Sequence, residues 1–412
     1  MASGLGLTEF DAALKQHYTA DRVEDMVYKD NPFLAMVPKY ERFGGRNLPI
    51  PIVHGNPQGR SKTFSNAQTR STATSSLVKD FVLTRVKDYG IATLDNETML
   101  ASEGDANAWM EAATLEIDGI INSVTRSLAV NLTRTSDAYL GQVNAEPAEN
   151  ASTFDVVMKD AEEITNVEVD QVHVIYSAAS GGSIRTSDGS DDEWVVAAVN
   201  RSSGTITYTG TYDASGTIAA DDYIFVEGDR GLGVSGLEDW LPATAPTSGD
   251  SFFGVDRSVD VTRLAGLRYD GSSDPIEEAL IKGDSLVCRE GMKLTHYFMN
   301  HRALADLKKS LGSKVQYVNL QVNPRISFPG VVVDGAKGPI SVIGDHNFPD
   351  NRIFGLNMDY IKFYSIGKAV RVLDTDGLAM LRQSSDDGVE VRYGFYGQLG
   401  IRAPGSCINI QI

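Results

Sequence analysis

The sequence predicts an α+β protein with an extended arm and loop, one long helix, a mixed body and an inserted small all-β domain. Three observations lead to this prediction. Apolar residues recur at helical spacing from about residue 103 to residue 134. Short strand-like runs separated by Gly, Ser and Asp turns fill residues 166–235. Helices and strands then alternate, and the chain ends in strands.

Residues 1–54 have the pattern of an N-terminal arm with short helices. Thr8 is a suitable cap for a helix whose apolar side chains follow at helical spacing. The run DNPF at 30–33 interrupts helical structure, because the residue before a proline avoids the α region. For the same reason NLPIPIV at 47–53 is predicted to be extended.

Residues 55–93 predict a long two-stranded loop that leaves the body of the protein. Its first part is rich in Gly, Ser, Thr and Asn, so it cannot bury a core by itself. Its second part alternates as a strand does. The loop has a net charge of +4, from six basic residues against Asp80 and Asp88. The basic residues are Arg60, Lys62, Arg70, Lys79, Arg85 and Lys87.

The next element is a single helix of about eight turns, predicted over residues 103–134. Ser102 is a suitable N-cap. The apolar positions at steps of three and four are Trp109, Ala113, Ile117, Ile120, Ile121, Val124 and Leu128. Residues 94–118 have a net charge of −7, part of which the helix dipole favours at an N-terminus.

Residues 153–165 predict a further helix, and the inserted all-β domain follows it. Its strand-like runs read VDQVHVIYSAA, EWVVAAVN, GTITYTGTYD and DYIFVEGD. Residues 155–240 hold 17 acidic and 4 basic residues, a net charge of −13, which is most of the chain's −18. Beyond the insert, helices are predicted at 275–291 and 301–312, and strands follow to the end of the chain.

A glycine motif after the β domain raises the question of a nucleotide site. Gly231, Gly233 and Gly236 have the G-x-G-x-x-G spacing of dinucleotide-binding folds. Such a fold needs a helix directly after the third glycine, and Pro242 and Pro246 leave no room for it. A glycine-rich turn at the exit of the insert is the favoured interpretation.

No other segment has the pattern of a catalytic, cofactor or metal site, so we expect no enzyme. The acidic turn SDGSDDE lacks the glycine and the last carboxylate of a calcium loop. The six histidines form no metal-binding pair, and Cys288 and Cys407 are too few for a cysteine metal site. A net charge of −18 argues against a protein that grips nucleic acid through a basic surface. Neither a secretory signal nor a membrane span is expected.

The loop at 55–93 needs a partner, because a long segment without its own core must pack against something. We expect that partner to be another copy of the chain, whose long helix begins with acidic residues that match the basic loop. Repeated head to tail, such a contact closes rings. The residues predicted to meet between subunits are Arg60, Lys62 and Arg70 on the loop and Glu103, Asp105 and Glu111 on the helix.

This order of parts resembles the major capsid proteins of tailed bacteriophages, which share the Hong Kong 97-like fold. The segments that carry the resemblance are DNPFLAMVPK, GLEDWLP, FFGVDRS, RLAGLRYDG, FMNHRALADLKKSLGSK and YGFYGQLGIRAPGSCINI. The resemblance implies an N-terminal arm at 1–54, an extended loop (E-loop) at 55–93 and a peripheral domain at 94–150 with a spine helix. It further implies an axial domain at 151–379 that contains the insert, and C-terminal strands at 380–412 that complete the peripheral domain.

By the same resemblance, the chain is a structural protein that self-assembles, through hexamers and pentamers, into an icosahedral shell around double-stranded DNA. The implied partners are a separate scaffolding protein, a portal protein and packaged DNA held without sequence-specific binding. A decoration protein is an open alternative. The chain would be part of the virion and would assemble in the bacterial host cytoplasm.

Two other functions stay open at this stage. An encapsulin-type nanocompartment shell protein shares the fold, and an unrelated enzyme with an insert would need a cluster of catalytic residues. Some members of the capsid family cross-link Lys to Asn. Lys62 and Lys79 with Asn347 and Asn357 are the candidates here, although ordinary surface residues are the favoured interpretation.

Overall fold

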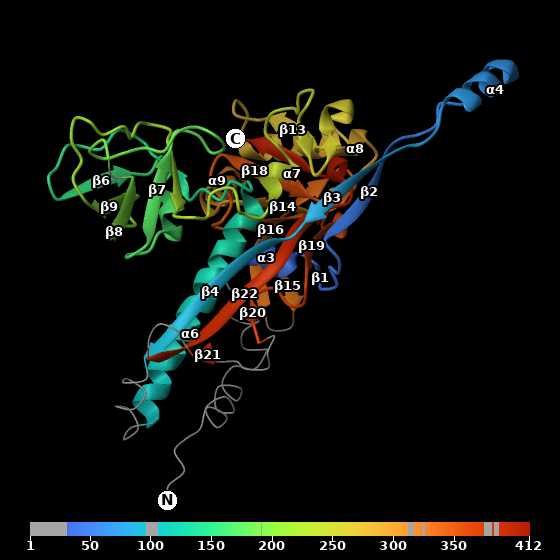
Figure 1. Ribbon diagram of the computed structural model, residues 1–412. Coiled ribbons are helices and arrows are strands. Elements are labelled where there is room, and N and C mark those ends of the chain that lie inside the picture. Colours follow the sequence, from blue (N-terminus) through green and yellow to red (C-terminus); the bar gives the residue numbers. More distant parts are fainter. Residues whose placement is uncertain are drawn as a thin grey trace, which may run out of the picture.

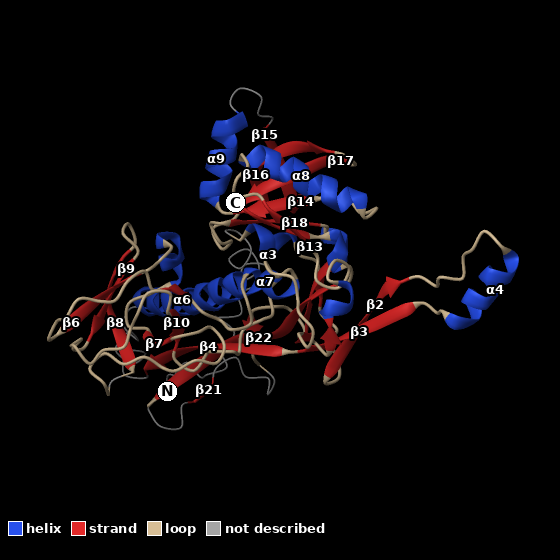
Figure 2. Ribbon diagram, turned by 90° about the horizontal axis from the view of Figure 1, so that it is seen from above, coloured by secondary structure: helices blue, strands red, loops and turns tan. Residues whose placement is uncertain are grey.

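The computed structural model describes residues 31–95, 106–190, 192–311, 317–323, 326–374, 381–382 and 387–412. These residues form two sheets that share a core, an inserted β domain on one side and a hairpin that reaches far from the body (Figures 1 and 2). None of the helices in these ranges combines the length and the apolar character that crossing a membrane requires.

A six-stranded sheet carries the long helix on one face. Its strands are β1 (Lys39–Tyr40), β4 (Val86–Asp95), β19 (Ile361–Ser365), β20 (Arg371–Val372), β21 (Leu381–Arg382) and β22 (Gly388–Ile401). The helix is α6 (Ala106–Thr133), which runs beside β4 and β22 (Figure 1). Ile117, Ile121 and Leu128 are fully buried on the face that the helical spacing predicts. Gly90 of β4 lets the helix approach, because a Cβ there would lie 2.6 Å from Val124 Cγ2.

The strand β4 corrects one boundary of the predicted loop. Residues 86–93 were expected to belong to the excursion at 55–93, but they pair with β22 along its length, from Val86 opposite Gly397 to Asp95 opposite Gly388. The alternation of the segment was predicted correctly, while its partner lies about 300 residues away and leaves no local signal. The hairpin is instead formed by β2 (Asn47–Gly55), which lies inside the predicted arm, and β3 (Leu77–Thr84).

A seven-stranded sheet forms the second half of the body. Its strands, in spatial order, are β13 (Leu267–Asp270), β23 (Ile408–Gln411), β18 (Arg352–Leu356), β14 (His296–Met299), β17 (Gly338–Gly344), β16 (Ile326–Gly335) and β15 (Tyr317–Asn323). The helices α8 (Ile276–Arg289) and α9 (His301–Leu311) cover one face, against Tyr297 and Met299. Phe298, between these two residues, points to the opposite face and joins the larger core.

The chain's last strands divide between the two sheets. β22 pairs with β19 and β4 in the six-stranded sheet, but β23 does not belong to that sheet. The 3-10 turn η5 (Pro404–Ser406) redirects the chain, and β23 enters the seven-stranded sheet between β13 and β18. The prediction that both final strands complete one domain is therefore wrong for β23.

The inserted domain is a six-stranded sheet with its own core. Its strands, in spatial order, are β5 (Gly141–Gln142), β10 (Tyr223–Val226), β7 (Val172–Tyr176), β8 (Glu193–Asn200), β9 (Thr205–Thr209) and β6 (Thr153–Val157). The buried residues of this core, among them Phe154, Trp194 and Tyr208, are separate from the core of the body. The domain starts near residue 140, earlier than the predicted boundary of 166, because β5 and β6 are short strands whose partners lie far ahead.

The helix predicted at 153–165 is instead a strand followed by a short 3-10 helix. Residues 153–157 form β6, in which Phe154 and Val156 are buried and Asp155 is exposed, and which pairs with β9. Asp160 then caps η1 (Ala161–Asn166) by accepting a hydrogen bond from the Glu162 amide. The apolar run fits both periods over so short a length, and the pairing with β9 decides between them.

The glycine motif lies at the exit of the insert, where the structure forms turns. Gly231 has a φ of +72°, which favours glycine. Gly236 lies against the end of α6, and a Cβ there would lie 2.3 Å from the carbonyl oxygen of Asn131. The only helix that follows directly is the single turn α7 (Leu237–Trp240). The motif thus serves a turn and a close packing contact.

The remaining described elements connect these parts. They are α3 (Pro32–Met36), β2 (Asn47–Gly55), α4 (Phe64–Ala73), β3 (Leu77–Thr84), β11 (Ser251–Phe252), β12 (Val255–Asp256), η2 (Arg257–Asp260) and η4 (Met358–Tyr360). The arm is fastened to the body at α3, where the Phe33 amide donates to the buried carboxylate of Asp345 at 3.1 Å.

Candidate assembly surface

The hairpin of β2 and β3 is rooted in the core of the body. Alternate side chains of its proximal half are buried, namely Ile50, Ile52, Phe81 and Leu83. The ring of Phe81 lies 5.2 Å from that of the fully buried Trp240. The root is therefore fixed, and the direction in which the hairpin leaves the body is fixed with it.

The distal half of the hairpin, residues 53–78, projects from the body and ends in α4 (Figure 1). No residue of α4 is buried. Nevertheless the tip is closed by its own hydrogen bonds. Arg70 Nη1 donates to the carbonyl of Arg60 at 3.1 Å, and the Gln58 amide donates to Thr74 Oγ1 at 3.0 Å. The tip is thus organised before it meets a partner.

Large apolar side chains are exposed on this distal half. Phe64, the first residue of α4, is 83% exposed, although the helix around it is polar. Val53, Leu77 and Val78 are exposed on the strands below it. A soluble chain seldom keeps such a group of apolar side chains in water unless they contact a partner. The prediction from sequence considered only the charges of this loop, yet a lone aromatic in the polar run RSKTFSN was a readable signal.

The predicted contact residues are found in two places and in part lie outside the described ranges. Arg60, Lys62 and Arg70 are all on the tip, and Arg70 has the additional role of closing it. Glu103 and Asp105 fall outside the described residues. Glu111 lies in the first half of α6, and only its backbone is described.

One chain cannot bring these two charged groups together. The first turns of α6 and the tip helix α4 lie far apart, at opposite corners of the view in Figure 1. The hairpin root is buried in the body, so the tip cannot fold back over its own α6. If the charges meet, they meet between two copies of the chain.

A second exposed apolar surface lies on the six-stranded sheet. Tyr89 and Ile91 of β4 are about half exposed, and the ring of Tyr89 lies 5.9 Å from that of Tyr396 on β22. Gly90, between them, faces α6, so these side chains point away from the helix. This surface was missed from sequence because it depends on the pairing of β4 with β22.

Both cross-linking candidates among the asparagines are inside the protein. Asn347 and Asn357 are each 3% exposed. The Asn347 side-chain amide donates to Asp345 Oδ1 at 2.9 Å, and that of Asn357 donates to the carbonyl of Lys293 at 3.1 Å. A lysine of another subunit could not reach either amide in this conformation. Both asparagines are buried, so the prediction that they are ordinary surface residues is wrong.

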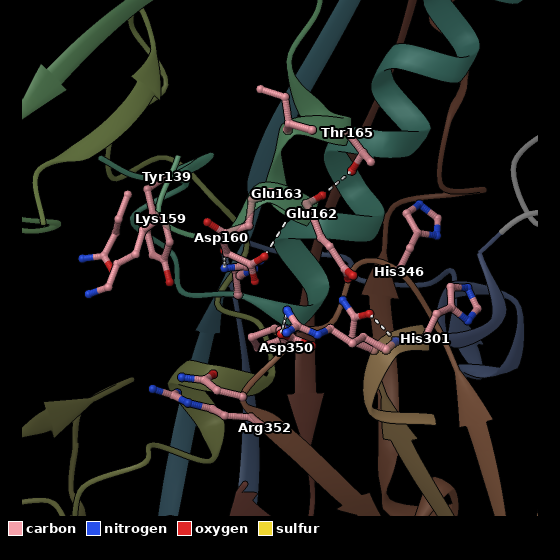
Figure 3. A pocket seen from close by; sticks show the side chains of 18 of the residues that line it. Tyr139, Lys159, Asp160, Glu162, Glu163, Thr165, His301, His346, Asp350 and Arg352 are labelled. Carbon is pink, nitrogen blue, oxygen red and sulfur yellow. Dashed lines mark hydrogen bonds and ion pairs between the residues drawn. The ribbon is translucent and has the colours of Figure 1, made fainter. Parts of the chain in front are cut away.

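A polar cleft with a volume of about 1010 Å³ lies between the insert and the body (Figure 3). Glu162 and Glu163 of η1 line one wall, and Asp350 and His301 line the other. Burial raises the pKa of Glu162, and the facing carboxylate of Asp350 raises it further. Within the described part of the chain no group of three or more His, Cys, Asp or Glu side chains is placed to hold a metal ion.

No family model and no curated protein matches the chain. Solved structures do match over nearly all of it. A cyanophage A-1(L) capsid asymmetric unit is 12% identical with a TM-score of 0.46, over 93% of this chain and 92% of that chain. A Synechococcus elongatus encapsulin complex is 9% identical with a TM-score of 0.43, over 97% and 94%. A chain of Mycobacterium phage Bobi is 9% identical with a TM-score of 0.42, over 99% of both chains.

Proposed function

We propose that this chain is the major capsid protein of a tailed bacteriophage, a structural subunit that self-assembles into an icosahedral shell around double-stranded DNA. The observation that carries the proposal is the β2–β3 hairpin. Its root is part of the subunit core, while its distal half is preorganised, exposes apolar side chains and buries none of α4. A segment with this construction is suited to bind another protein.

The partner in this proposal is a second copy of the same chain. The donor surface is the basic, apolar tip, and the acceptor is at the far end of the molecule, near the acidic start of α6. Because donor and acceptor are different surfaces, the contact is heterologous, and repeating it closes a ring where the rotation between neighbours divides a full turn. Rings of six and five such subunits are the units from which we propose that the shell is built.

The domain assignment that goes with this proposal follows the observed sheets. The six-stranded sheet with α6 is the peripheral domain, and the seven-stranded sheet with α8 and α9 is the axial domain. The extended loop then covers residues 47–84, and the inserted β domain covers about 140–229. Each of these boundaries is set by the strands that pair in the structure, whereas the boundaries predicted from sequence were set by composition.

The chain's charge is consistent with a container for DNA. A net charge of −18 keeps the wall from binding the genome tightly, which favours both packing and release. We further propose a separate scaffolding protein and a portal as assembly partners, with assembly in the bacterial cytoplasm. The acidic insert is the surface that we assign to contacts with neighbouring subunits or with a decoration protein.

Negative-stain microscopy of the purified protein, alone and with a candidate scaffolding protein, tests the proposal. We expect closed shells or capsomer rings. A variant in which residues 57–75 are replaced by a short Gly-Ser turn should remain a folded subunit and form neither, because no residue of α4 is buried.

Uniform small particles of the unmodified protein under every condition would overturn the proposal. Shells that enclose a co-purified enzyme and no DNA would point to the encapsulin-type function. Normal shells from the variant without the tip would show that the chain forms shells and that the hairpin is not needed for it.

A further inference from the structure

The inserted domain is attached to the body by a stalk of two chain segments. Its entering segment follows α6 at residues 134–139, and its leaving segment spans residues 227–236. The two segments are hydrogen-bonded to each other, with the Gly231 amide donating to Asp137 at 2.9 Å and the Gly233 amide to Ser136 at 3.0 Å. No residue of the insert's core belongs to a core cluster of the body. Apolar packing therefore does not fix the angle of the domain.

Instead, ion pairs with the last turns of α6 fix the angle of the domain. Arg134, directly after α6, forms an ion pair with Glu163 of η1, and both side chains are about nine-tenths buried. Earlier in α6, Arg126 pairs with Glu168 at 2.6 Å, and Glu168 also pairs with Arg201 at 2.8 Å. These three side chains are about half exposed. The insert thus has one buried and one exposed charged contact with the helix.

The buried pair continues into the body. The Arg134 guanidinium lies 5.7 Å over the ring of Tyr139, whose hydroxyl donates to Glu238 at 3.4 Å. Glu238 in turn pairs with Arg352 of β18 at 3.1 Å. For Arg134, burial is the largest single effect and acts to lower the pKa, but the charges of Glu163, Tyr139 and Glu238 together outweigh it, so the pKa is raised. Because a guanidinium keeps its charge, loss of the Glu163 charge would leave it buried and unpaired.

The polar cleft gives the insert room to move. It separates η1 from α9 and from the turn at residues 349–352, and Glu162 points across it toward Asp350 (Figure 3). The facing carboxylates repel each other, which disfavours closure of the cleft, while the side chain of Asn300 on that wall forms a hydrogen bond with Glu162. Arg302 pairs with Asp350 at 3.0 Å, and its charge also acts to lower the pKa of Glu162. Charged side chains therefore act on the inserted domain both at α6 and across the cleft.

We propose that the inserted domain tilts as a rigid body on its stalk. The buried Arg134–Glu163 pair is the point about which the domain turns, and we call it the pivot. The exposed contact of Arg126, Glu168 and Arg201 holds the domain at one angle until this contact breaks, and we call it the catch. Exposed ion pairs weaken with salt, whereas buried pairs are screened much less. Salt thus releases the catch and leaves the pivot in place. The inference concerns one chain and does not depend on shell formation.

Distance measurement across the cleft tests this proposal in the full chain. Spin labels go on Ser203→Cys in the insert and Ala305→Cys on α9, both exposed, with Cys288→Ser to avoid a third label. At low salt we expect one narrow distance distribution. In about 1 M NaCl, where the screening length is about 3 Å, the distribution should broaden and shift.

Three variants and one control variant separate the catch from the pivot. Glu168→Gln should reproduce the effect of salt at low salt, and Glu193→Gln, at an exposed glutamate of β8 outside this contact, should have no effect. Glu163→Gln should broaden the distribution at every salt concentration. Arg134→Met with Glu163→Met removes both charges, so no unpaired charge remains, and it should stay sensitive to salt through the catch.

Hydrogen exchange in β7, β8 and β9 is the accompanying readout. We expect the protection of these strands to stay unchanged in every variant, because a tilting domain remains folded. A distribution that neither salt nor Glu168→Gln alters would overturn the catch. Broadening that comes with loss of protection in these strands would overturn the tilt and indicate unfolding of the domain.

Discussion

The β2–β3 hairpin and the inserted domain both leave the body of the subunit, and they are built in opposite ways. The insert has six strands around buried aromatic side chains, among them Trp194 and Tyr208. The distal hairpin has two strands and a helix without a buried residue. A segment with its own core is positioned by the contacts at its base. A segment without one gains its packing only from a partner.

Producing the two segments alone tests most directly whether only the insert has a core of its own. We expect residues 137–232 to fold, because three or more strands with an apolar face are stable, and residues 45–86 to remain unfolded, because an isolated hairpin is marginal. Dispersed amide spectra and a cooperative thermal transition are the measurements. A folded hairpin or an unfolded insert would contradict the distinction.

The next largest effect concerns acid and the insert's core. His173 is fully buried, with Nδ1 2.8 Å from the Tyr208 hydroxyl, and burial lowers its pKa from 6.5 to about 4. The folded domain holds the neutral ring, so its stability is complete above pH 6.5 and falls as the pH drops from 6.5 to about 4. The loss is about 3 kcal/mol, taken from the size of this pKa shift.

Hydrogen exchange in β7 to β9 of the full chain at pH 7 and pH 4.5 measures this loss. The variant His173→Gln removes the titrating group, so its exchange, corrected for the intrinsic effect of pH, should change much less between the two conditions. Equal acid sensitivity of the variant and the parent chain would show that another group is responsible.

A smaller effect is expected from the apolar tip. Truncating an aromatic anchor in a protein interface costs about 2 kcal/mol, so Phe64→Ser should raise the concentration needed for assembly by about 30-fold. The melting temperature of the subunit should stay the same, because Phe64 is 83% exposed. Val259→Ser, at an apolar side chain that is 60% exposed on η2, is the matched control. Assembly that is equally weak in both variants, or unchanged in both, would contradict a specific role for Phe64.

The smallest effect is expected from the charges of the tip. Exposed ion pairs contribute about 0.2–1 kcal/mol each, so Arg60→Glu with Lys62→Glu should weaken assembly several-fold, and added salt should reduce the difference. Arg70→Gln should act differently, since it removes the hydrogen bond that closes the tip, and its effect should persist in high salt. Light scattering during assembly measures both. A salt-independent effect of the double variant would contradict a contact between charges.

The elements that could be predicted from sequence are those whose signal is local. The helix α6 has apolar residues at steps of three and four, and α9 ends where the pattern ends. The strands β4 and β23 carry a clear alternation, but their sheets are decided by partners at the other end of the chain or in the middle of it. In the same way, β6 was mistaken for a helix because β9 lies about 50 residues farther on.

In the candidate site, too, the parts with a local signal could be predicted and the parts that depend on distant pairing could not. The basic tip could be predicted from composition, since Arg60, Lys62 and Arg70 stand in a polar run. The surface at Tyr89 and Ile91 exists only because β4 pairs with β22, and the pair of Arg134 with Glu163 only because η1 returns to the end of α6. Geometry that depends on distant pairing leaves no trace in a short window of sequence.

The position of β23 has a consequence for synthesis. This strand, residues 408–411, separates β13 from β18, and β22 before it is the hub of the other sheet. Neither sheet can close until residues 388–411 have left the ribosome. Residues 47–84 leave it long before, but the core that holds the root of the hairpin includes Leu399 and Ile401 of β22. A nascent chain that has already made its hairpin therefore cannot yet fix the direction in which the hairpin leaves the body.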